Sequence, residues 1–255
     1  MVSGPSRLDA QARGWKTLRG LHPIPIDLDR LQLIRERLPS ELSQCDALEE
    51  LVLQLGLNDE GIDEYPPQLH PFCGHGLRIW QYPRQFARYL ANVASLGVRS
   101  YLEVGVRHGG SFVATVELLR RFGALDHAVA VDIIACPALD TYARSNAGVR
   151  CAWLNTQSAA FEELLDGLGK TDLVFIDSHH EEAQCRLEIA VLAARANILA
   201  LHDVSNVRCP GIAKVWNEIK EDSRFQCVEY VEQYAELGPF MGIGLAIRKD
   251  RMSTT

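Results

Sequence analysis

The feature that most constrains this chain is the alternation of two hydrophobic patterns after residue 98. Short apolar runs, which suit buried parallel strands, alternate with amphipathic runs, which suit helices that cover a sheet. Because strand and helix alternate, we predict an α/β fold with a mostly parallel sheet. Strands are expected at 99–106, 128–134, 149–154, 173–177 and 197–202, and helices at 111–122, 138–145, 158–168, 181–195 and 210–222.

The end of the chain breaks this rhythm. A sixth strand is expected at 227–232 and a seventh at 241–248, with Gly238-Pro239 between them and no pattern for a helix. Strands that lack a crossover helix pair in the antiparallel sense. We therefore predict a seven-stranded sheet that is mostly parallel and has an antiparallel last strand, with the final two strands paired at its edge.

The first 76 residues follow another pattern and are predicted to be a helical extension and linker to the domain at 77–255. Leu31, Ile34 and Leu38 mark one short amphipathic helix, and a second is expected over 47–55. Two roles remain open for this extension. The first role is structural, in which the extension packs on the domain or mediates a homodimer. The second role is to cap the active site.

The ends of the second helix carry their own signals. Asp46 and Glu49 have the spacing of a capping box, and Gly56 can close the helix. The segment 59–76 is rich in Pro, Gly and acidic residues, and is expected to be a loop or linker. A helix of the main domain is then expected over 84–95, with Phe86, Tyr89, Leu90 and Val93 facing inward.

Composition excludes several classes of protein. The 255 residues carry a formal net charge of -7 without a dense Lys/Arg run, so we expect no nucleic-acid partner. No run reaches the roughly 18 apolar residues of a membrane span, and Met-Val-Ser-Gly-Pro-Ser at the start lacks the apolar core of a signal peptide. The seven cysteines form no C-x-x-C pair, which indicates reduced thiols and a cytoplasmic protein without a structural zinc site.

A glycine-rich loop follows the first expected strand. Glu103 precedes Gly105, and Gly109, Gly110 and Ser111 open the next helix. Glycines allow a close approach of backbone to a ligand, and a helix N-terminus favours an anion. A dinucleotide fingerprint has the tighter spacing G-x-G-x-x-G. The spacing here, with a carboxylate that would repel a pyrophosphate, fits the zwitterionic amino-acid end of S-adenosylmethionine better than NAD.

Two further positions suit an adenosine ligand. Asp132 ends the second strand, where a carboxylate can accept hydrogen bonds from two ribose hydroxyls, a device that NAD-binding proteins share. Gln157 and Ser158 follow the third strand and could reach the adenine. For Ser158 the alternative is an ordinary helix N-cap.

Acids and histidines follow the fourth and fifth strands. The fourth strand is followed by Asp177, His179 and His180, and the fifth strand is followed by His202 and Asp203. Because the carboxyl ends of parallel strands meet at one edge, both clusters should face one cleft beside the glycine loop. Such groups can hold a divalent metal or move a proton. Simple capping of helices and loops is the alternative.

These segments carry a resemblance to a known family. Residues 175–181 resemble the FIDGDHSYE segment of small-molecule O-methyltransferases, a group that includes macrolide-sugar and aminocoumarin methyltransferases and the cephalosporin hydroxylases. Residues 201–204 resemble its LHDV segment, 102–105 with 109–111 its LEIG and GGS segments, and 80–83 its WQ-x-P element. The resemblance covers about residues 78–250. It implies a Rossmann-like class I methyltransferase fold that binds S-adenosylmethionine, with Gln81 near the cofactor.

The resemblance also implies a metal site. In this group Mg²⁺ is commonly held by a carboxylate at the position of Asp177 and an acidic pair after the fifth strand, which here are His202 and Asp203. The chain departs from the pattern, since His202 replaces an acid and His179 replaces a second Asp. Mg²⁺ prefers oxygen ligands, so a transition metal, or no metal, remains an alternative.

The implied reaction is methyl transfer to a hydroxyl oxygen of a small molecule in secondary metabolism. His180 matches the family histidine and is the expected base, because its ordinary pKa allows proton uptake near neutral pH. Asp177 is expected to serve both catalysis and cofactor binding. The alternatives are an NAD-dependent oxidoreductase and a non-catalytic, methyltransferase-like binding domain.

Overall fold

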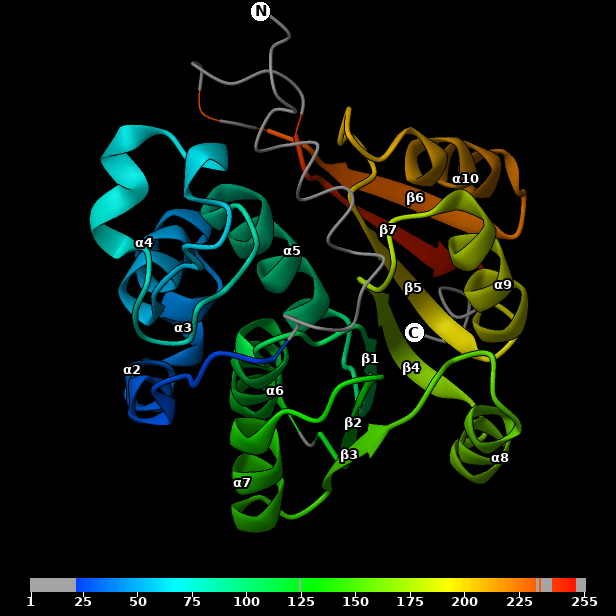
Figure 1. Ribbon diagram of the computed structural model, residues 1–255, viewed down its shortest axis with the longest axis horizontal. Helices are drawn as coiled ribbons and strands as arrows, with labels where there is room; N and C mark the ends of the chain where they lie inside the picture. The colour runs from blue at the N-terminus through cyan, green and yellow to red at the C-terminus, as the bar shows by residue number, and fades with distance from the viewer. Residues whose placement is uncertain (1–21, 124, 233, 235–239, 251–255) are drawn as a thin grey trace, which may run out of the picture.

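The computed structural model describes residues 22–123, 125–232, 234 and 240–250. A sheet of seven strands runs through the middle of the protein, with helices on both faces (Figure 1). The Met-Val-Ser-Gly-Pro-Ser segment and Gly238-Pro239, both used in the sequence analysis, lie outside the described residues. None of the described helices combines the length and apolar character needed to cross a membrane.

The sheet confirms the predicted topology. Its strands follow the order β3-β2-β1-β4-β5-β7-β6. Strands β1 to β5 are parallel to one another. Strand β7 is antiparallel to both β5 and β6. The chain order reverses between β1 and β4, and such a switch point opens a crevice for ligands at the carboxyl ends of the strands. The strands are β1 Ser100–Val104, β2 His127–Asp132, β3 Val149–Trp153, β4 Thr171–Ile176, β5 Ala196–His202, β6 Phe225–Tyr230 and β7 Ile243–Arg248.

The helices divide between the two faces of the sheet because strand side chains alternate. Tyr101 and Phe175 point into the core under α5, α6 and α7, whereas Leu102 and Val174 point into the core under α8, α9 and α10 (Figure 1). Predicted boundaries in this part lie within two residues of the observed ones, except that α9 ends at Leu192. The helices are α5 Pro83–Ser95, α6 Gly110–Phe122, α7 Pro137–Ser145, α8 Ala159–Leu168, α9 Glu182–Leu192 and α10 Pro210–Glu221.

The N-terminal segments pack on the face that α5 and α6 cover (Figure 1). Leu31 and Ile34 are buried in the same hydrophobic core as Phe86 of α5. Arg35 donates two hydrogen bonds, of 2.9 and 2.8 Å, to the carboxylate of Glu117 in α6. The segments are η1 Leu28–Leu31, α2 Gln32–Arg35, α3 Pro39–Leu42, α4 Cys45–Leu55, η2 Ile62–Glu64 and η3 Pro67–Phe72.

Two details of this region differ from the prediction. Leu38 is 60% exposed because the first helix ends at Arg35 and Pro39 then starts α3. The second helix begins at Cys45, so Asp46 lies inside its first turn and makes no capping box. Side-chain spacing alone could not fix where the backbone enters the helix.

The predicted end of α4 and the burial of α5 are confirmed. Gly56 closes α4 with a positive φ of 98°. Phe86, Tyr89, Leu90 and Val93 are all buried. The expected linker contains the two short helices η2 and η3.

Candidate functional site

A cavity of about 640 Å³ opens at the carboxyl ends of the parallel strands. The glycine loop between β1 and α6 forms one side. The segments after β4 and β5 form the other. The size and position suit a small-molecule site in an α/β sheet. Of the predicted site residues, the lining includes Gln81, Gly105, Ser111, Asp132, Gln157, Asp177, His180, His202 and Asp203.

The glycines of the loop serve close packing within the protein. A Cβ atom on Gly105 would lie 2.2 Å from the carbonyl oxygen of Asp177, and φ there is +87°. A Cβ atom on Gly110 would lie 2.0 Å from the carbonyl oxygen of Leu77. Gly109 has φ +90° and is the N-cap of α6. Gly109 and Gly110 do not line the cavity, so their identity is explained by backbone geometry.

Asp132 anchors the glycine loop. Its Oδ2 accepts hydrogen bonds of 3.0 Å from the backbone N–H groups of Val106 and Arg107, and its Oδ1 accepts one of 3.1 Å from Ile134. The carboxylate also lines the cavity. Asp132 therefore holds the first two strand ends together at the place where the sequence predicts the ribose.

Glu103 is fully buried beneath the loop and does not line the cavity. Its carboxyl group accepts hydrogen bonds from the hydroxyls of Tyr101 and Ser111, the latter at 2.7 Å. Burial raises the pKa of Glu103 to about 8, although both hydrogen bonds act in the opposite direction. Its link to the cavity runs through Ser111, which does line it.

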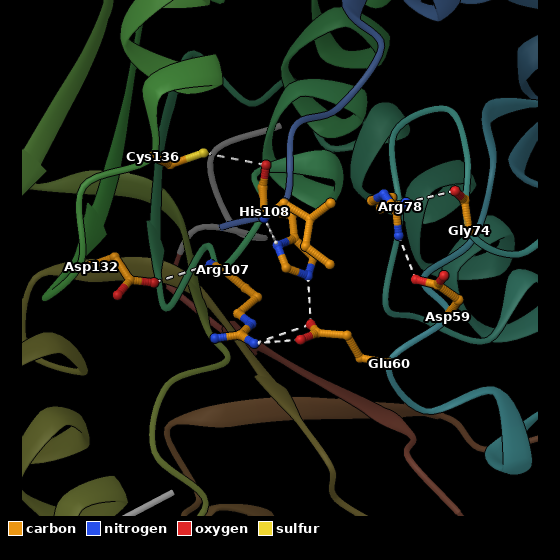
Figure 2. Close-up of polar contacts among 9 residues, drawn as sticks. Asp59, Glu60, Gly74, Arg78, Arg107, His108, Asp132 and Cys136 are labelled. Carbon is orange, nitrogen blue, oxygen red and sulfur yellow. Dashed lines mark hydrogen bonds and ion pairs between the residues drawn. The ribbon is translucent and has the colours of Figure 1, made fainter. Parts of the chain in front are cut away.

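The N-terminal region clamps the same loop, a feature that the sequence did not reveal. Glu60 accepts hydrogen bonds of 2.8 and 3.1 Å from the Arg107 guanidinium and lies 2.6 Å from Nε2 of His108 (Figure 2). Nδ1 of His108 accepts a hydrogen bond from the backbone N–H of Ile24, so Nε2 carries the proton that points at Glu60. His108 is only 2% exposed.

A second ion pair fixes the neighbouring turn. Arg78, which lines the cavity, pairs with Asp59 and donates a 2.6 Å hydrogen bond to the carbonyl oxygen of Gly74 (Figure 2). Arg78 has φ +52°, which places its backbone in the left-handed region. Residues from the N-terminal region thus help to build the wall of the cavity.

Ser158 acts as a helix cap. Its hydroxyl oxygen accepts a 3.3 Å hydrogen bond from the backbone N–H of Phe161, and it does not line the cavity. Gln157 does line the cavity and donates a 2.5 Å hydrogen bond to Gln184 of α9. The capping interpretation of Ser158 is therefore confirmed.

A polar network lies beside Gln157. Gln184 donates hydrogen bonds of 2.8 Å to Thr156 and 2.7 Å to Glu188, and Thr156 donates one of 2.9 Å to Glu188. All three residues line the cavity. Sequence reasoning did not single them out, because residues spread over a loop and a helix form no local motif.

His180 is paired with a buried carboxylate. Its Nδ1 lies 2.6 Å from Oδ2 of Asp203, while the Cys209 sulfur lies 3.7 Å from the same oxygen. Burial by itself lowers the pKa of the His180 imidazole, but the Asp203 carboxylate outweighs this effect and raises the pKa well above its ordinary value. Asp203 adopts φ +63°, and Asn206 donates a 2.8 Å hydrogen bond to its Oδ1. His180 is thus oriented by a fixed carboxylate.

His179 takes a different direction from His180. Its Nε2 lies 3.4 Å from the Glu181 carboxylate, and its side chain is 41% exposed. The structure therefore favours His180 over His179 as the ordered imidazole of the cavity.

Asp177, His202 and Asp203 form the cluster that the sequence predicts. Their ligand atoms lie within 4.8 Å of one another. Nδ1 of His202 lies 2.9 Å from Oδ1 of Asp177 and 3.6 Å from Oδ1 of Asp203. Gln81 donates a 2.8 Å hydrogen bond to Oδ2 of Asp177, which ties the segment before α5 to the cluster.

The segment before the last strand supplies cavity residues that the sequence analysis did not identify. Phe240 and Met241, which precede β7, line the cavity together with Arg208. The Arg208 guanidinium lies 5.0 Å from the centre of the Phe240 ring, a cation–π distance. These residues give the cavity an apolar and a cationic element.

The comparisons with known proteins point to one family. Residues 102–204 match a family model described as a methyltransferase domain. No curated protein matches the chain.

Several solved structures are similar in fold. The O-methyltransferase TomG from Streptomyces achromogenes, in complex with S-adenosylmethionine, is 14% identical with a TM-score of 0.49, over 67% of this chain and 81% of its own. The O-methyltransferase from Bacillus cereus, in complex with S-adenosylhomocysteine, is 17% identical with a TM-score of 0.45, over 94% and 97%. The methyltransferase MycE of the mycinamycin biosynthetic pathway, in complex with Mg, S-adenosylhomocysteine and mycinamycin VI, is 17% identical with a TM-score of 0.45, over 66% and 50%.

Proposed function

We propose that this protein, whose residues 102–204 belong to the methyltransferase-domain family within a class I S-adenosylmethionine-dependent methyltransferase fold, methylates a hydroxyl oxygen of a small molecule. One observation carries the proposal. A single cavity is bounded by the glycine loop with Asp132 on one side and by the paired His180 and Asp203 on the other. A candidate cofactor site and a proton acceptor therefore face the same cavity.

We propose that the cofactor lies along the carboxyl ends of β1 and β2. Asp132 would accept hydrogen bonds from the ribose hydroxyls, and Gln157 lies where the adenine would extend. The amino-acid end would meet Ser111 and the backbone near Gly105. Glu103 would act through Ser111 or bind the ammonium group after exchanging one of its present hydrogen-bond partners.

The proposed chemistry needs one proton acceptor. The acceptor oxygen attacks the sulfonium methyl group, the S–C bond breaks, and S-adenosylhomocysteine leaves as a neutral thioether. The hydroxyl proton passes to His180 in its neutral form. Because Asp203 raises the pKa of this imidazole well above its ordinary value, the neutral form is favoured at alkaline pH and the reaction should be faster there. Asp203, fixed 2.6 Å from Nδ1, orients the ring and stabilises the imidazolium that forms. Much of the acceleration would come from holding the two reactants in line.

Mg²⁺ does not fit the donor atoms of this site. The cluster places an imidazole, rather than a third carboxylate, between Asp177 and Asp203. Mg²⁺ prefers oxygen ligands in octahedral geometry. We therefore derive no step of the reaction through Mg²⁺.

An acceptor of natural-product type is the substrate class that we propose. The lining of the cavity includes the aromatic ring of Phe240, Met241 and the cation of Arg208. A mixed apolar and polar surface of this kind suits a sugar or phenol carrying a hydroxyl group.

The alternative as an NAD-dependent oxidoreductase is disfavoured by the sheet. The dinucleotide fold continues with a parallel sixth strand beside the fifth, whereas here the antiparallel β7 lies next to β5. A titration with both cofactors separates the two functions.

Calorimetry tests the proposal. S-adenosylhomocysteine should bind the purified chain with one site, and NAD⁺ should not bind. Asp132→Asn should weaken this binding, while Asp166→Asn, on the exposed surface of α8, should not. Binding of NAD⁺ alone would contradict the proposed cofactor. Tight binding without methylation of any hydroxyl acceptor in a panel of sugars and phenols would favour a non-catalytic domain.

A further inference from the structure

We propose that Asp177, His202 and Asp203 bind a first-row transition ion of the Co²⁺ to Zn²⁺ type in preference to Mg²⁺. The inference deepens the proposed function, since the ion would lie in the methyl-transfer cavity. It stands on three features of the cluster, which are a buried imidazole with an unpartnered Nε2, the spacing of the ligand atoms and the support of both carboxylates.

The imidazole of His202 is buried and only partly satisfied by the described residues. Its side chain is only 6% exposed, and Nδ1 lies 2.9 Å from an Asp177 carboxylate oxygen. Nε2 is buried without a partner among the described residues. Buried polar groups are nearly always satisfied, because leaving one unpaired costs free energy. An ion bound to a ring nitrogen would remove that cost.

The spacing of the ligand atoms suits one ion. Two ligands that bind a transition ion at about 2.0–2.1 Å lie roughly 2.9–3.4 Å apart in octahedral or tetrahedral geometry. The distances from Nδ1 of His202 to the two carboxylates are 2.9 and 3.6 Å. The first distance lies within this range, and the second exceeds it by 0.2 Å.

Each carboxylate is held by a neighbour on its other oxygen. Asp177 accepts from Gln81 through Oδ2 and turns Oδ1 toward His202. Asp203 lies against His180 through Oδ2 and turns Oδ1 toward His202. Neighbours that orient ligands in this way are a general feature of metal sites and raise their affinity.

The chemistry of the donors selects the class of ion. Imidazole nitrogen suits Fe²⁺, Ni²⁺, Cu²⁺ and Zn²⁺, whereas Mg²⁺ favours carboxylate, carbonyl and water oxygens. A softer donor is also nearby, since His180, Asp203 and Cys209 form a second group of ligand atoms within 4.8 Å. The two groups share Asp203.

The test uses the full chain after treatment with a chelator, without cofactor. Co²⁺ is titrated while visible absorption and heat are recorded, and Mg²⁺ is titrated by heat alone. We expect one equivalent of Co²⁺, new d–d absorption bands, and binding of Mg²⁺ at least about 100-fold weaker. Binding of S-adenosylhomocysteine is measured separately, so that failure of this inference and failure of the proposed function can be told apart.

Because most sites prefer Co²⁺ to Mg²⁺, the decisive measurement is a change of preference. His202→Asp replaces nitrogen by oxygen and should lower the Co²⁺/Mg²⁺ affinity ratio at least about tenfold. His202→Phe should abolish the d–d bands. His127→Gln, at the exposed start of β2, controls for binding to surface histidines. Circular dichroism checks that each variant is folded.

Three results would overturn the inference. They are absence of Co²⁺ uptake by the wild-type chain, uptake that His202→Phe leaves unchanged, and an affinity ratio that His202→Asp does not lower. If His202→Phe does not fold, the ratio measured for His202→Asp decides alone.

Discussion

The two sides of the cavity differ in how their buried polar groups are hydrogen-bonded. On the glycine-loop side, Asp132 accepts three backbone hydrogen bonds, and His108 is bonded through both ring nitrogens. On the histidine side, Nε2 of His202 and Oε1 of Gln81 are buried without a hydrogen-bond partner among the described residues. The protein itself satisfies Asp132 and His108, but it does not satisfy these two atoms.

This difference indicates which interactions hold each side of the cavity in position. The loop is held by the chain, through Asp132 and the Glu60 clamp from the N-terminal region. It is therefore arranged for the cofactor before binding, which lowers the entropic cost of association. The histidine side keeps polar atoms unpaired in the protein alone. Such atoms destabilise the unliganded protein and favour a ligand.

The largest expected effect is on the histidine side. His180→Ala should lower the rate of methyl transfer about 10²–10⁴-fold, because a positioned base contributes that much. The affinity for S-adenosylhomocysteine should remain near that of the wild type, since the loop side is intact. Single-turnover rates and calorimetry measure the two quantities. Unchanged turnover would remove His180 from the mechanism.

The next effect concerns Glu103 and pH. The folded state keeps the Glu103 proton up to a pKa of about 8, whereas the unfolded state releases it near its ordinary value of 4.5. The stabilising contribution of the protonated form is complete below about pH 4.5 and is lost as pH rises toward 8. Glu103→Gln stays neutral and should gain stability relative to the wild type on the order of a few kcal/mol between pH 5 and 8.

Thermal denaturation of both proteins from pH 5 to 9 measures this difference. Contributions of other groups cancel, because only Glu103 is changed. A stability difference that does not grow with pH would show that Glu103 is ionised in the folded protein.

A smaller effect is expected for the clamp. Glu60→Gln keeps the shape of the side chain but removes the charge that meets Arg107 and His108. We expect a loss of about 1–3 kcal/mol in the free energy of unfolding. Affinity for S-adenosylhomocysteine should also fall, because the loop is less ordered.

Urea denaturation and calorimetry test the clamp, with Glu163→Gln at an exposed position of α8 as the matched control. If Glu60→Gln behaves as the control does, the clamp is unimportant for the loop.

The smallest effect separates two roles of one residue. Ser158→Ala removes the N-cap of α8 and should cost about 1 kcal/mol of stability. Affinity for S-adenosylhomocysteine should not change, because Ser158 does not line the cavity. A marked loss of cofactor affinity measured by calorimetry would return Ser158 to the cofactor site.

Much of the fold was predictable because hydrophobic periodicity is local. Buried strands such as β1 and β4 read as apolar runs, and the missing helix before β7 predicted the antiparallel pair. The N-terminal region was harder. Leu38 fitted a helical period, yet it is exposed because the chain turns at Pro39. Short helices depend on contacts with the rest of the protein, and periodicity does not record those contacts.

The grouping of Asp177 with His202 and Asp203 was also predictable, because adjacent parallel strands end at the same edge. The roles of the glycines were not. Gly105 and Gly110 were interpreted as leaving room for a ligand, but the atoms that a Cβ would meet belong to Asp177 and Leu77. Distances of this kind depend on how β4 and the segment before α5 pack against the loop.

The sequence by itself determined which strands meet and which chemical groups stand at their ends, because both follow from local pattern and chain order. Only the tertiary structure decided which of those groups are already paired. Glu60 lies 47 residues before Arg107 and Gln81 lies 96 residues before Asp177, and no local pattern links them. Hydrogen bonding between distant segments depends on side-chain directions that packing sets, and this is why the unpartnered Nε2 of His202 became visible only in the folded chain.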